Sequence, residues 1–215
     1  MPARVHPSNP LALAVLALLF ERPMHPYEMG VVLKQRHKED SIKFRYGSLY
    51  TVIDLLLRRG YVAARETARE GKRPERTVYE ITPAGLEELH AWMVDLIGQP
   101  AKEYPQFEAA LCLLPVLPPD EALTLLRRRL ELIEDDAAVL ARQIEQISIT
   151  NFPALFLVES EYRLAMLKAE QQFVADLIRR VEHGWGPIDL WRGFHQNHEA
   201  TIAKLYKQFG DAPMS

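Results

Sequence analysis

KFRYGSLYTVIDLLLRRG, residues 43–60, is the stretch around which the rest of the chain is organised. Its apolar side chains recur at the spacing of one helical face and are Leu49, Ile53, Leu56 and Leu57. Most of the polar side chains fall on the opposite side, and two arginines followed by Gly60 form a common helix end. The pattern therefore predicts an amphipathic helix with a small, polar and basic N-terminal end.

The segments before this stretch predict two more helices. Residues 11–20 are apolar nearly all round, which predicts a helix that is buried on several sides. Residues 25–37 form a second helix, which contains Gly30 although a glycine costs about 1 kcal/mol relative to alanine inside a helix. A close crossing with another helix would explain this glycine. The second helix, the connection 38–47 and the helix that follows it predict a helix-turn-helix.

The segments after the stretch predict a β-hairpin and a further helix. Residues 61–67 and 76–81 have the composition of short strands, and a charged tip, residues 69–74, joins them. Thr82, followed by proline, suits the cap and first turn of a helix that runs to about residue 97. Three helices, a hairpin with a basic tip and a fourth helix are typical of a winged helix.

The distribution of charge favours a DNA partner for this half of the chain. The whole chain has a formal net charge of −3 at pH 7. Residues 1–76, however, hold 14 Lys and Arg against 8 Asp and Glu, so the rest of the chain carries the acidic excess. A basic segment on an acidic body is expected where only one part meets phosphate. Chance clustering of charge is the alternative.

A winged helix can place its third helix in the major groove and its hairpin over neighbouring phosphates. Cations would then bind phosphate, and polar or aromatic side chains early in the helix would reach base edges. The predicted DNA-binding residues are Lys43, Arg45, Tyr46, Ser48, Tyr50 and Thr51 in the opening stretch, and Lys72, Arg73 and Arg76 in the hairpin. Tyr50 is equally consistent with packing against the second helix, and the tip cations with a solvated turn.

The second half of the chain predicts a separate helical domain. A polar, proline-bounded connection, residues 99–105, divides the chain into domains 1–98 and 99–215. A long helix follows, whose apolar positions alternate in steps of three and four, which indicates coiled-coil packing. These positions are Leu123, Leu126, Leu130, Ile133, Ala137, Leu140, Ile144 and Ile147.

Residues 153–183 predict a second long helix that returns antiparallel to the first. Its apolar positions follow a similar rhythm and are Leu155, Val158, Tyr162, Ala165 or Met166, Ala169, Phe173, Leu177 and Val181. Two such helices leave one apolar face uncovered, which predicts a homodimer. The alternative is a bundle within one chain that includes the helix after Pro187.

Several classes of protein are disfavoured by the sequence. The apolar run Leu11 to Phe20 is too short to cross a membrane and lacks a signal-peptide cleavage site. The single cysteine, Cys112, excludes an intrachain disulfide, fits the cytoplasm and is expected to be buried in its apolar segment. Neither a catalytic constellation nor a phosphate loop nor a zinc-spaced cysteine pair occurs, so we expect no enzyme, cofactor or metal.

Two further site hypotheses are weaker. His195, His198 and Glu199 share a predicted helix and would suit a metal-responsive sensor, but further ligands are missing and a solvated helix face is the better interpretation. Trp92 lies on the helix that joins the two domains, where a large aromatic ring can stack on a flat effector. A tryptophan packed in a dimer seam is the alternative.

Three segments, in order, resemble the PadR-type transcriptional regulators. LALAVLALLFERPMHPYEM resembles the first helix of that family and the start of its second, RYGSLYTVIDLLLRRGYV its recognition helix, and ERTVYEITPAGLEEL its second wing strand and fourth helix. Together they cover about residues 10–97. The resemblance implies a homodimeric, repressor-type regulator of a palindromic operator, with a small-molecule effector in many members and an acidic, helical dimerisation domain in the long ones.

Residues and resemblance together predict a mainly α fold with a small β-hairpin: an N-terminal winged helix-turn-helix and a C-terminal helical, coiled-coil-like dimerisation domain. The predicted protein is a cytoplasmic transcriptional regulator, and its predicted partners are double-stranded DNA, a second copy of the chain and a small aromatic effector. A helical adaptor whose winged helix binds another protein is the alternative. Residues 187–215 extend beyond the family's usual pattern and receive no role from the sequence.

Overall fold

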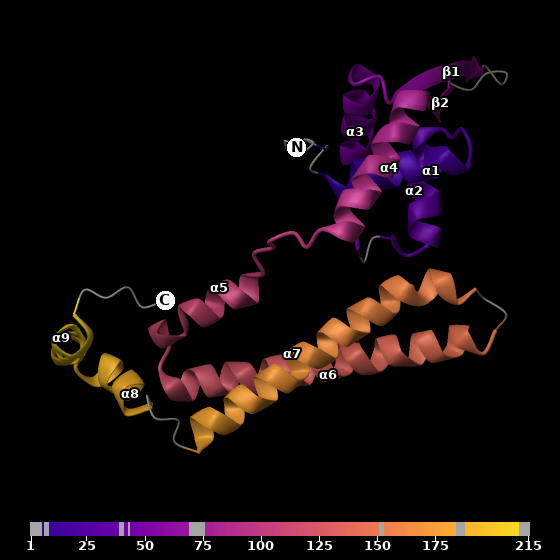
Figure 1. Ribbon diagram of the computed structural model, residues 1–215. Coiled ribbons are helices and arrows are strands. Elements are labelled where there is room, and N and C mark those ends of the chain that lie inside the picture. The colour runs from indigo at the N-terminus through magenta and orange to yellow at the C-terminus, as the bar shows by residue number, and fades with distance from the viewer. Residues whose placement is uncertain are drawn as a thin grey trace. The chain divides into compact units, whose positions relative to one another are not determined.

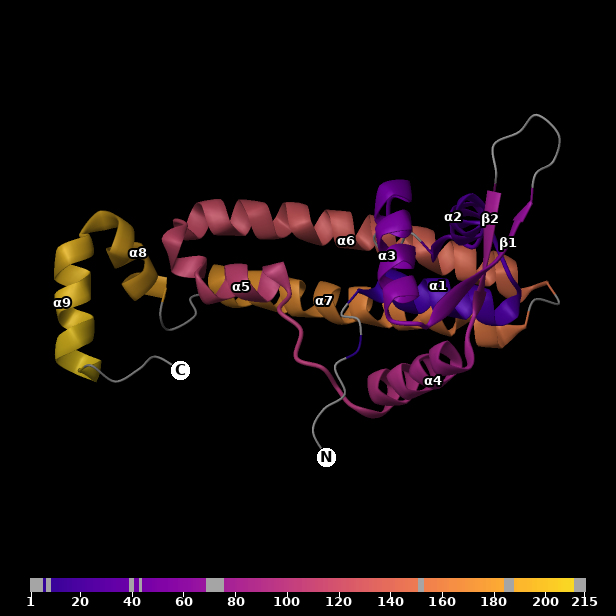
Figure 2. The same ribbon diagram turned by 90° about the horizontal axis from the view of Figure 1, so that it is seen from above.

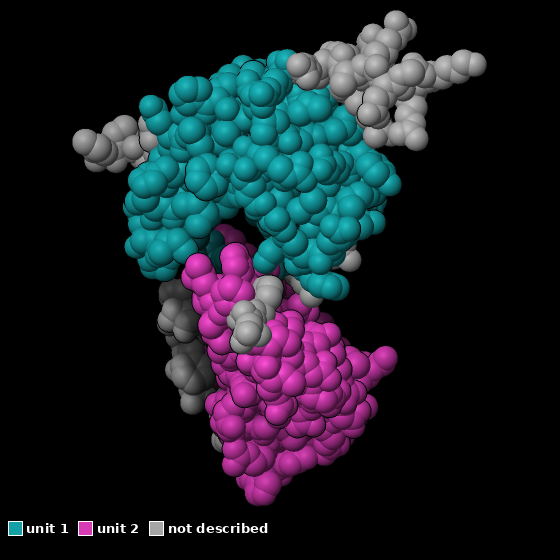
Figure 3. All heavy atoms as spheres, turned by 90° about the vertical axis from the view of Figure 1, so that its right-hand side faces the viewer, with its two compact units in different colours: residues 1–103 teal, residues 104–215 magenta. Residues whose placement is uncertain are grey.

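The computed structural model describes residues 6, 9–38, 41–42, 44–68, 76–150, 153–183 and 188–210. The chain divides into two compact units, residues 1–103 (unit 1) and residues 104–215 (unit 2), which Figure 3 draws in teal and magenta. The described residues are mostly helical, with one two-stranded antiparallel sheet, which confirms the predicted fold class.

Unit 1 is a winged helix-turn-helix (Figure 1). Its described elements, in chain order, are α1 (Pro10–Glu21), α2 (Pro26–Gln35), α3 (Tyr46–Arg58), β1 (Val62–Ala68), β2 (Arg76–Ile81) and α4 (Pro83–Gly98).

The core of unit 1 is built around α1. This helix packs against α3, α4 and β2, which is why it is apolar on nearly every side. The helix α3 turns its predicted apolar face into the same core, where Leu49, Ile53 and Leu56 are fully buried and Leu57 is half-buried. The amphipathic pattern of the opening stretch therefore did predict how α3 is oriented.

The hairpin is joined to the helices at its base. β1 and β2 pair in antiparallel register from Val62 opposite Ile81 to Ala68 opposite Arg76, with a bulge between Ala64 and Glu66. Met24, in the connection from α1 to α2, exchanges two backbone hydrogen bonds of 3.0 Å with Tyr79 of β2. The wing thus rests on the start of the helix-turn-helix.

A tight joint connects the hairpin to α4. The Thr82 hydroxyl accepts a hydrogen bond from the Gly85 N–H at 3.1 Å and donates one to the Gly60 carbonyl at 2.7 Å. A Cβ atom on Gly85 would overlap the carbonyl oxygen of Tyr61, so glycine is required there. The predicted threonine cap therefore also ties the end of α3 to the start of α4.

Unit 2 is a helical hairpin with shorter helices at its ends (Figure 1). Its described elements are α5 (Gln106–Cys112), the short 3₁₀ helix η2 (Leu114–Val116), α6 (Pro119–Ser148), the 3₁₀ helix η3 (Ala154–Leu157), α7 (Val158–Glu182), α8 (Ile188–Gln196) and α9 (His198–Phe209).

The helices α6 and α7 lie side by side and antiparallel (Figure 2). Arg127, near the start of α6, forms a 2.6 Å ion pair with Glu182, the last residue of α7. The predicted seam of α6 faces this contact, since Leu126, Ile133 and Leu140 are buried. The seam is therefore covered by α7 of the same chain.

The buried face of α7 differs from the predicted one. Leu177 and Val181 are buried as the three-four rhythm predicts, but Val158, Tyr162 and Phe173 are exposed. Leu164, Leu167, Val174 and Ile178 turn inward or are partly covered instead. Because α7 carries two apolar stripes, periodicity alone could not say which of them faces α6.

The shorter helices α5 and α8 differ in how they pack in unit 2. Cys112 is exposed, contrary to the prediction of a buried thiol, because the short helix α5 buries none of its residues. The helix α8 packs onto the hairpin through Ile188 and Trp191, and the Trp191 indole donates a 2.7 Å hydrogen bond to the Leu117 carbonyl. Among the described helices, none is both long and apolar enough to span a membrane.

Candidate nucleic-acid interface

The exposed side of α3 is a continuous helical stripe. Gly47, Tyr50, Thr51, Asp54 and Arg58 recur every three or four residues and are partly or fully exposed. They lie opposite the face that α3 buries in the core of unit 1. We call these five residues the α3 stripe.

The N-terminus of α3 is closed by its own side chains. The Ser48 hydroxyl accepts a hydrogen bond from the Arg45 N–H at 2.9 Å and donates one to the Arg45 carbonyl at 2.7 Å. The Thr51 hydroxyl donates to the Gly47 carbonyl at 3.1 Å. Both hydroxyl protons are therefore used inside the helix, so that Ser48 and Thr51 could meet a base only as hydrogen-bond acceptors.

Tyr46 fills the crossing between α2 and α3. Its ring stacks on Tyr27 at 5.9 Å between centroids, and the ammonium group of Lys34 lies 5.2 Å from its centroid. A Cβ atom on Gly30 would lie 2.5 Å from the Tyr46 ring. The glycine in α2 thus does mark a close helix crossing, and Tyr46, a predicted DNA contact, has a packing role in the free protein.

Tyr50, by contrast, is 48% exposed. Of the two interpretations of this residue, packing against the second helix and contact with DNA, its exposure favours the second. Tyr79 of β2 lies near it: burial raises the pKa of the Tyr79 phenol, and the charges of Asp54 and Tyr50 raise it further. The α3 stripe and the base of the wing are therefore neighbours.

The cations of unit 1 differ in their availability. Arg22 and Arg36 form ion pairs with Glu28 and Glu21. In the described part of unit 1, Arg45 at the start of α3 and Arg58 and Arg59 at its end are exposed and have no ion-pair partner. These three arginines lie at the two ends of the α3 stripe, and the exposed Lys34 of α2 lies over the Tyr46 ring near its N-terminal end.

The structure locates only part of the predicted DNA-binding set. It brings together Arg45 at the N-cap of α3 and Tyr46, Ser48, Tyr50 and Thr51 on the first two turns of this helix. Lys43, Lys72, Arg73 and the side chain of Arg76 lie outside the described residues. The sequence pattern placed Asp54 and Arg58 with Thr51 on the side opposite the apolar face, as the structure has them, but neither residue was included in the predicted DNA-binding set.

Trp92 belongs to a different place in unit 1. It is 5% exposed and packs in the core, and the His6 imidazole stacks on it with 5.7 Å between centroids and parallel planes. The two His6 nitrogens lie 2.8 Å from Glu88 and 2.8 Å from Asp95. Hydrogen bonds to Asp95 and Glu88 raise the pKa of His6, so its charged form is favoured here.

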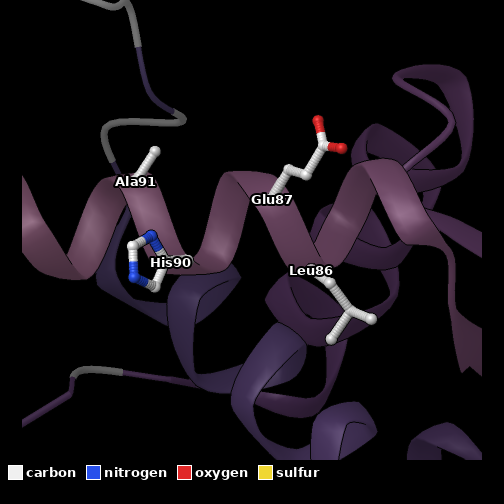
Figure 4. Close-up of a pocket in the computed structure, with 4 residues that line it drawn as sticks. All are labelled: Leu86, Glu87, His90 and Ala91. Atoms are coloured by element: carbon white, nitrogen blue, oxygen red, sulfur yellow. The ribbon is translucent and has the colours of Figure 1, made fainter.

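Two other places in the described chain gather polar side chains. Leu86, Glu87, His90 and Ala91 line an open hollow along α4, and Figure 4 shows their side chains; none was predicted as functional. In unit 2, His195 lies 3.0 Å from the Pro115 carbonyl and His198 packs against Phe194. The described residues contain no group of three potential ligands placed to hold a metal ion.

Comparison with known proteins supports the description of unit 1 as a winged helix-turn-helix. Residues 15–91 match the family model of the transcriptional regulator PadR-like family. None of the curated proteins compared with the chain matches it.

Solved structures share the fold. Bacillus subtilis PadR in complex with operator DNA has a TM-score of 0.62 and 20% identity, covering 80% of this chain and 99% of that one. The same protein in complex with p-coumaric acid has a TM-score of 0.65 and 17% identity over 80% and 98%. The Vibrio cholerae virulence activator AphA has a TM-score of 0.60 and 16% identity over 80% and 98%.

The family match over the winged helix is to a family of transcriptional regulators and not of enzymes, in agreement with the expectation from the sequence. Residues 15–91 thus form a domain of the PadR-like family of transcriptional regulators, and the chain shares the fold of the PadR structures.

Proposed function

We propose that this regulator binds a palindromic operator in double-stranded DNA as a homodimer, with one α3 stripe in the major groove of each half-site. The observation that carries the proposal is the α3 stripe itself, an exposed helical face beside the wing with exposed arginines at both ends. The match to the family model spans these elements. Bacillus subtilis PadR, which shares the fold, has been solved with operator DNA.

Phosphate binding is assigned to the cations around the stripe. Arg45 stands at the N-terminus of α3, where the helix dipole also favours an anion. The sequence assigns four more cations to phosphates beside the α3 stripe: Lys43 before α3, and Lys72, Arg73 and Arg76 in the hairpin. Tyr50 and Thr51 are assigned to base edges. Tyr46 and Ser48 belong to the same end of α3 and hold it in shape.

A gel shift on DNA from the region upstream of the protein's own gene tests the proposal. We expect a specific complex whose affinity falls steeply with salt, because phosphate contacts release counterions. Arg45→Ala should weaken binding to every sequence alike and lower the slope of log affinity against log salt by about 0.9. Lys204→Ala on α9 removes an equal charge from an exposed residue of unit 2 that lies outside the stripes of α6 and α7, and it should change neither quantity. Absence of any specific complex at moderate salt would overturn the proposal.

Homodimerisation is assigned to unit 2. The second apolar stripe of α7 is exposed, and on α6 the exposed residues Leu125, Leu132 and Val139 recur at intervals of seven. A solvated stripe of this length on a pair of packed helices is the pattern of a helical interface. Two copies joined there would present two α3 stripes, as a palindromic operator requires.

A repressor released by a small aromatic effector is the regulatory part of the proposal. Trp92 already accepts one flat ring, that of His6, so an effector would take the place of His6. The carboxylates of Glu88 and Asp95 at this place favour a neutral or cationic ring over an anionic one. His6→Ala should therefore increase the affinity for a flat cationic dye, and p-coumarate is the anionic comparison; equal affinity in wild type and variant would refute this site.

A further inference from the structure

The α3 stripe contains one acidic residue in a face assigned to DNA. Asp54 is exposed and lies one helical turn after Tyr50 and Thr51. In the described part of the chain, neither it nor Arg58, one turn further on, has an ion-pair partner. The carboxylate is therefore neither neutralised nor held by a neighbouring cation.

The position of Asp54 is set by helix geometry. Residues 47, 51, 54 and 58 fall on one line along α3, and the buried Ile53 and Leu56 fall on the other side. The helix α3 packs against β1, and the Asp54 charge is one of the causes that raise the pKa of Tyr79 on β2, so Asp54 lies on the side of α3 near the base of the wing. A groove deep enough to receive Tyr50 and Thr51 therefore also receives Asp54.

A carboxylate in that groove needs a hydrogen-bond donor. Phosphate oxygens repel it, and most base edges in the major groove present acceptors. The exocyclic amino group of cytosine is a donor without an adjacent acceptor on the same base, whereas the amino group of adenine stands beside the acceptor N7. Cytosine is thus the base whose edge best satisfies an aspartate.

We infer that Asp54 is a specificity-determining residue that accepts a hydrogen bond from the N4 amino group of one cytosine in each operator half-site. The inference rests on the proposed function and deepens it, because it names a base that the α3 stripe reads. Asp54 would also act against wrong sites, since an acceptor in place of the cytosine amino group leaves the carboxylate unpaired and repelled.

Selection from a library of randomised DNA duplexes by the full-length protein provides the test. Wild type, Asp54→Asn and Asp54→Ala are each put through selection, and their affinities for the winning duplex and its single-base variants are measured. Glu87→Gln on α4 is the matched control, because it removes the same charge from an exposed residue of unit 1 outside the α3 stripe.

We expect the wild-type site to contain one cytosine per half-site whose replacement lowers affinity about tenfold. With Asp54→Ala this discrimination should disappear at that position alone. With Asp54→Asn the preference should move to adenine, because an amide can donate to N7 and accept from N6. Glu87→Gln should leave the selected sequence unchanged. Circular dichroism confirms that each variant is folded.

Three results would overturn the inference. A uniform gain in affinity for all duplexes, with the preference unchanged, would make Asp54 a merely repulsive charge. An unchanged preference and affinity would place Asp54 outside the groove. If wild type binds no duplex at all, the proposed function fails and the inference fails with it, and that result differs from the other two because no complex forms.

Discussion

At the scale of single residues, the contact between His6 and α4 shows what sequence patterns cannot reveal. His6 lies 82 residues from Glu88 and 89 from Asp95 along the chain, yet it meets both carboxylates and the face of Trp92. Glu88 is 7% exposed, so His6 supplies the partner that a buried carboxylate needs. These contacts hold His6 against α4.

This contact makes the stability of unit 1 depend on pH. Because the pKa of His6 is raised in the folded protein, its contribution is fully present below about pH 6.5, the ordinary value for histidine, and is lost as the pH rises through the folded pKa. The difference in urea midpoint between wild type and His6→Ala should thus be larger at pH 5.5 than at pH 8.5. His90→Ala, an exposed histidine of α4, is the control. A difference that grows with pH would contradict the contact.

At the scale of elements, the sequence predicted those features that depend on residue spacing and residue type. The buried face of α3, the threonine cap of α4 and the close crossing at Gly30 follow from spacing and residue type, and the structure confirms all three. The roles of Tyr46 and Ser48 did not follow, because a basic, aromatic helix start has the same sequence whether its side chains point to DNA or close the helix. Which of the two apolar stripes of α7 is buried depends on how α6 packs against it, and the sequence of α7 does not contain that information.

The crossing of α2 and α3 gives a stability prediction. Gly30→Ala should gain about 1 kcal/mol from helix propensity but lose about 1–3 kcal/mol through the overlap with Tyr46, whose ring is held between Tyr27 and Phe44. We expect a net loss in the free energy of unfolding by urea.

Gly47→Ala is the matched control for this crossing. A Cβ atom there meets nothing within 4 Å, so this variant should be neutral or slightly stabilising. If both variants were stabilising, Tyr46 would not fill the crossing.

At the scale of the whole molecule, the proposed function requires two copies of the winged helix on one operator. One α3 stripe offers too few base contacts for a specific site, whereas two stripes on a dimer double the contacts and fix their spacing. The part of the chain with an acidic excess is also the part with the exposed apolar stripes. An acidic unit 2 would avoid phosphate, which leaves DNA to unit 1.

The dimer can be tested at one position. Leu132 is 57% exposed in the single chain and lies in the middle of the exposed stripe of α6, so Leu132→Glu should leave the fold of unit 2 intact but place a charge in the interface. Wild type should scatter light as a particle of twice 24.7 kDa at micromolar concentration, and the variant as a monomer with weaker operator binding. Ala138→Glu introduces the same residue on another side of α6 and should remain dimeric. A wild-type particle of 24.7 kDa would contradict the dimer, and the palindromic operator would lose its physical basis.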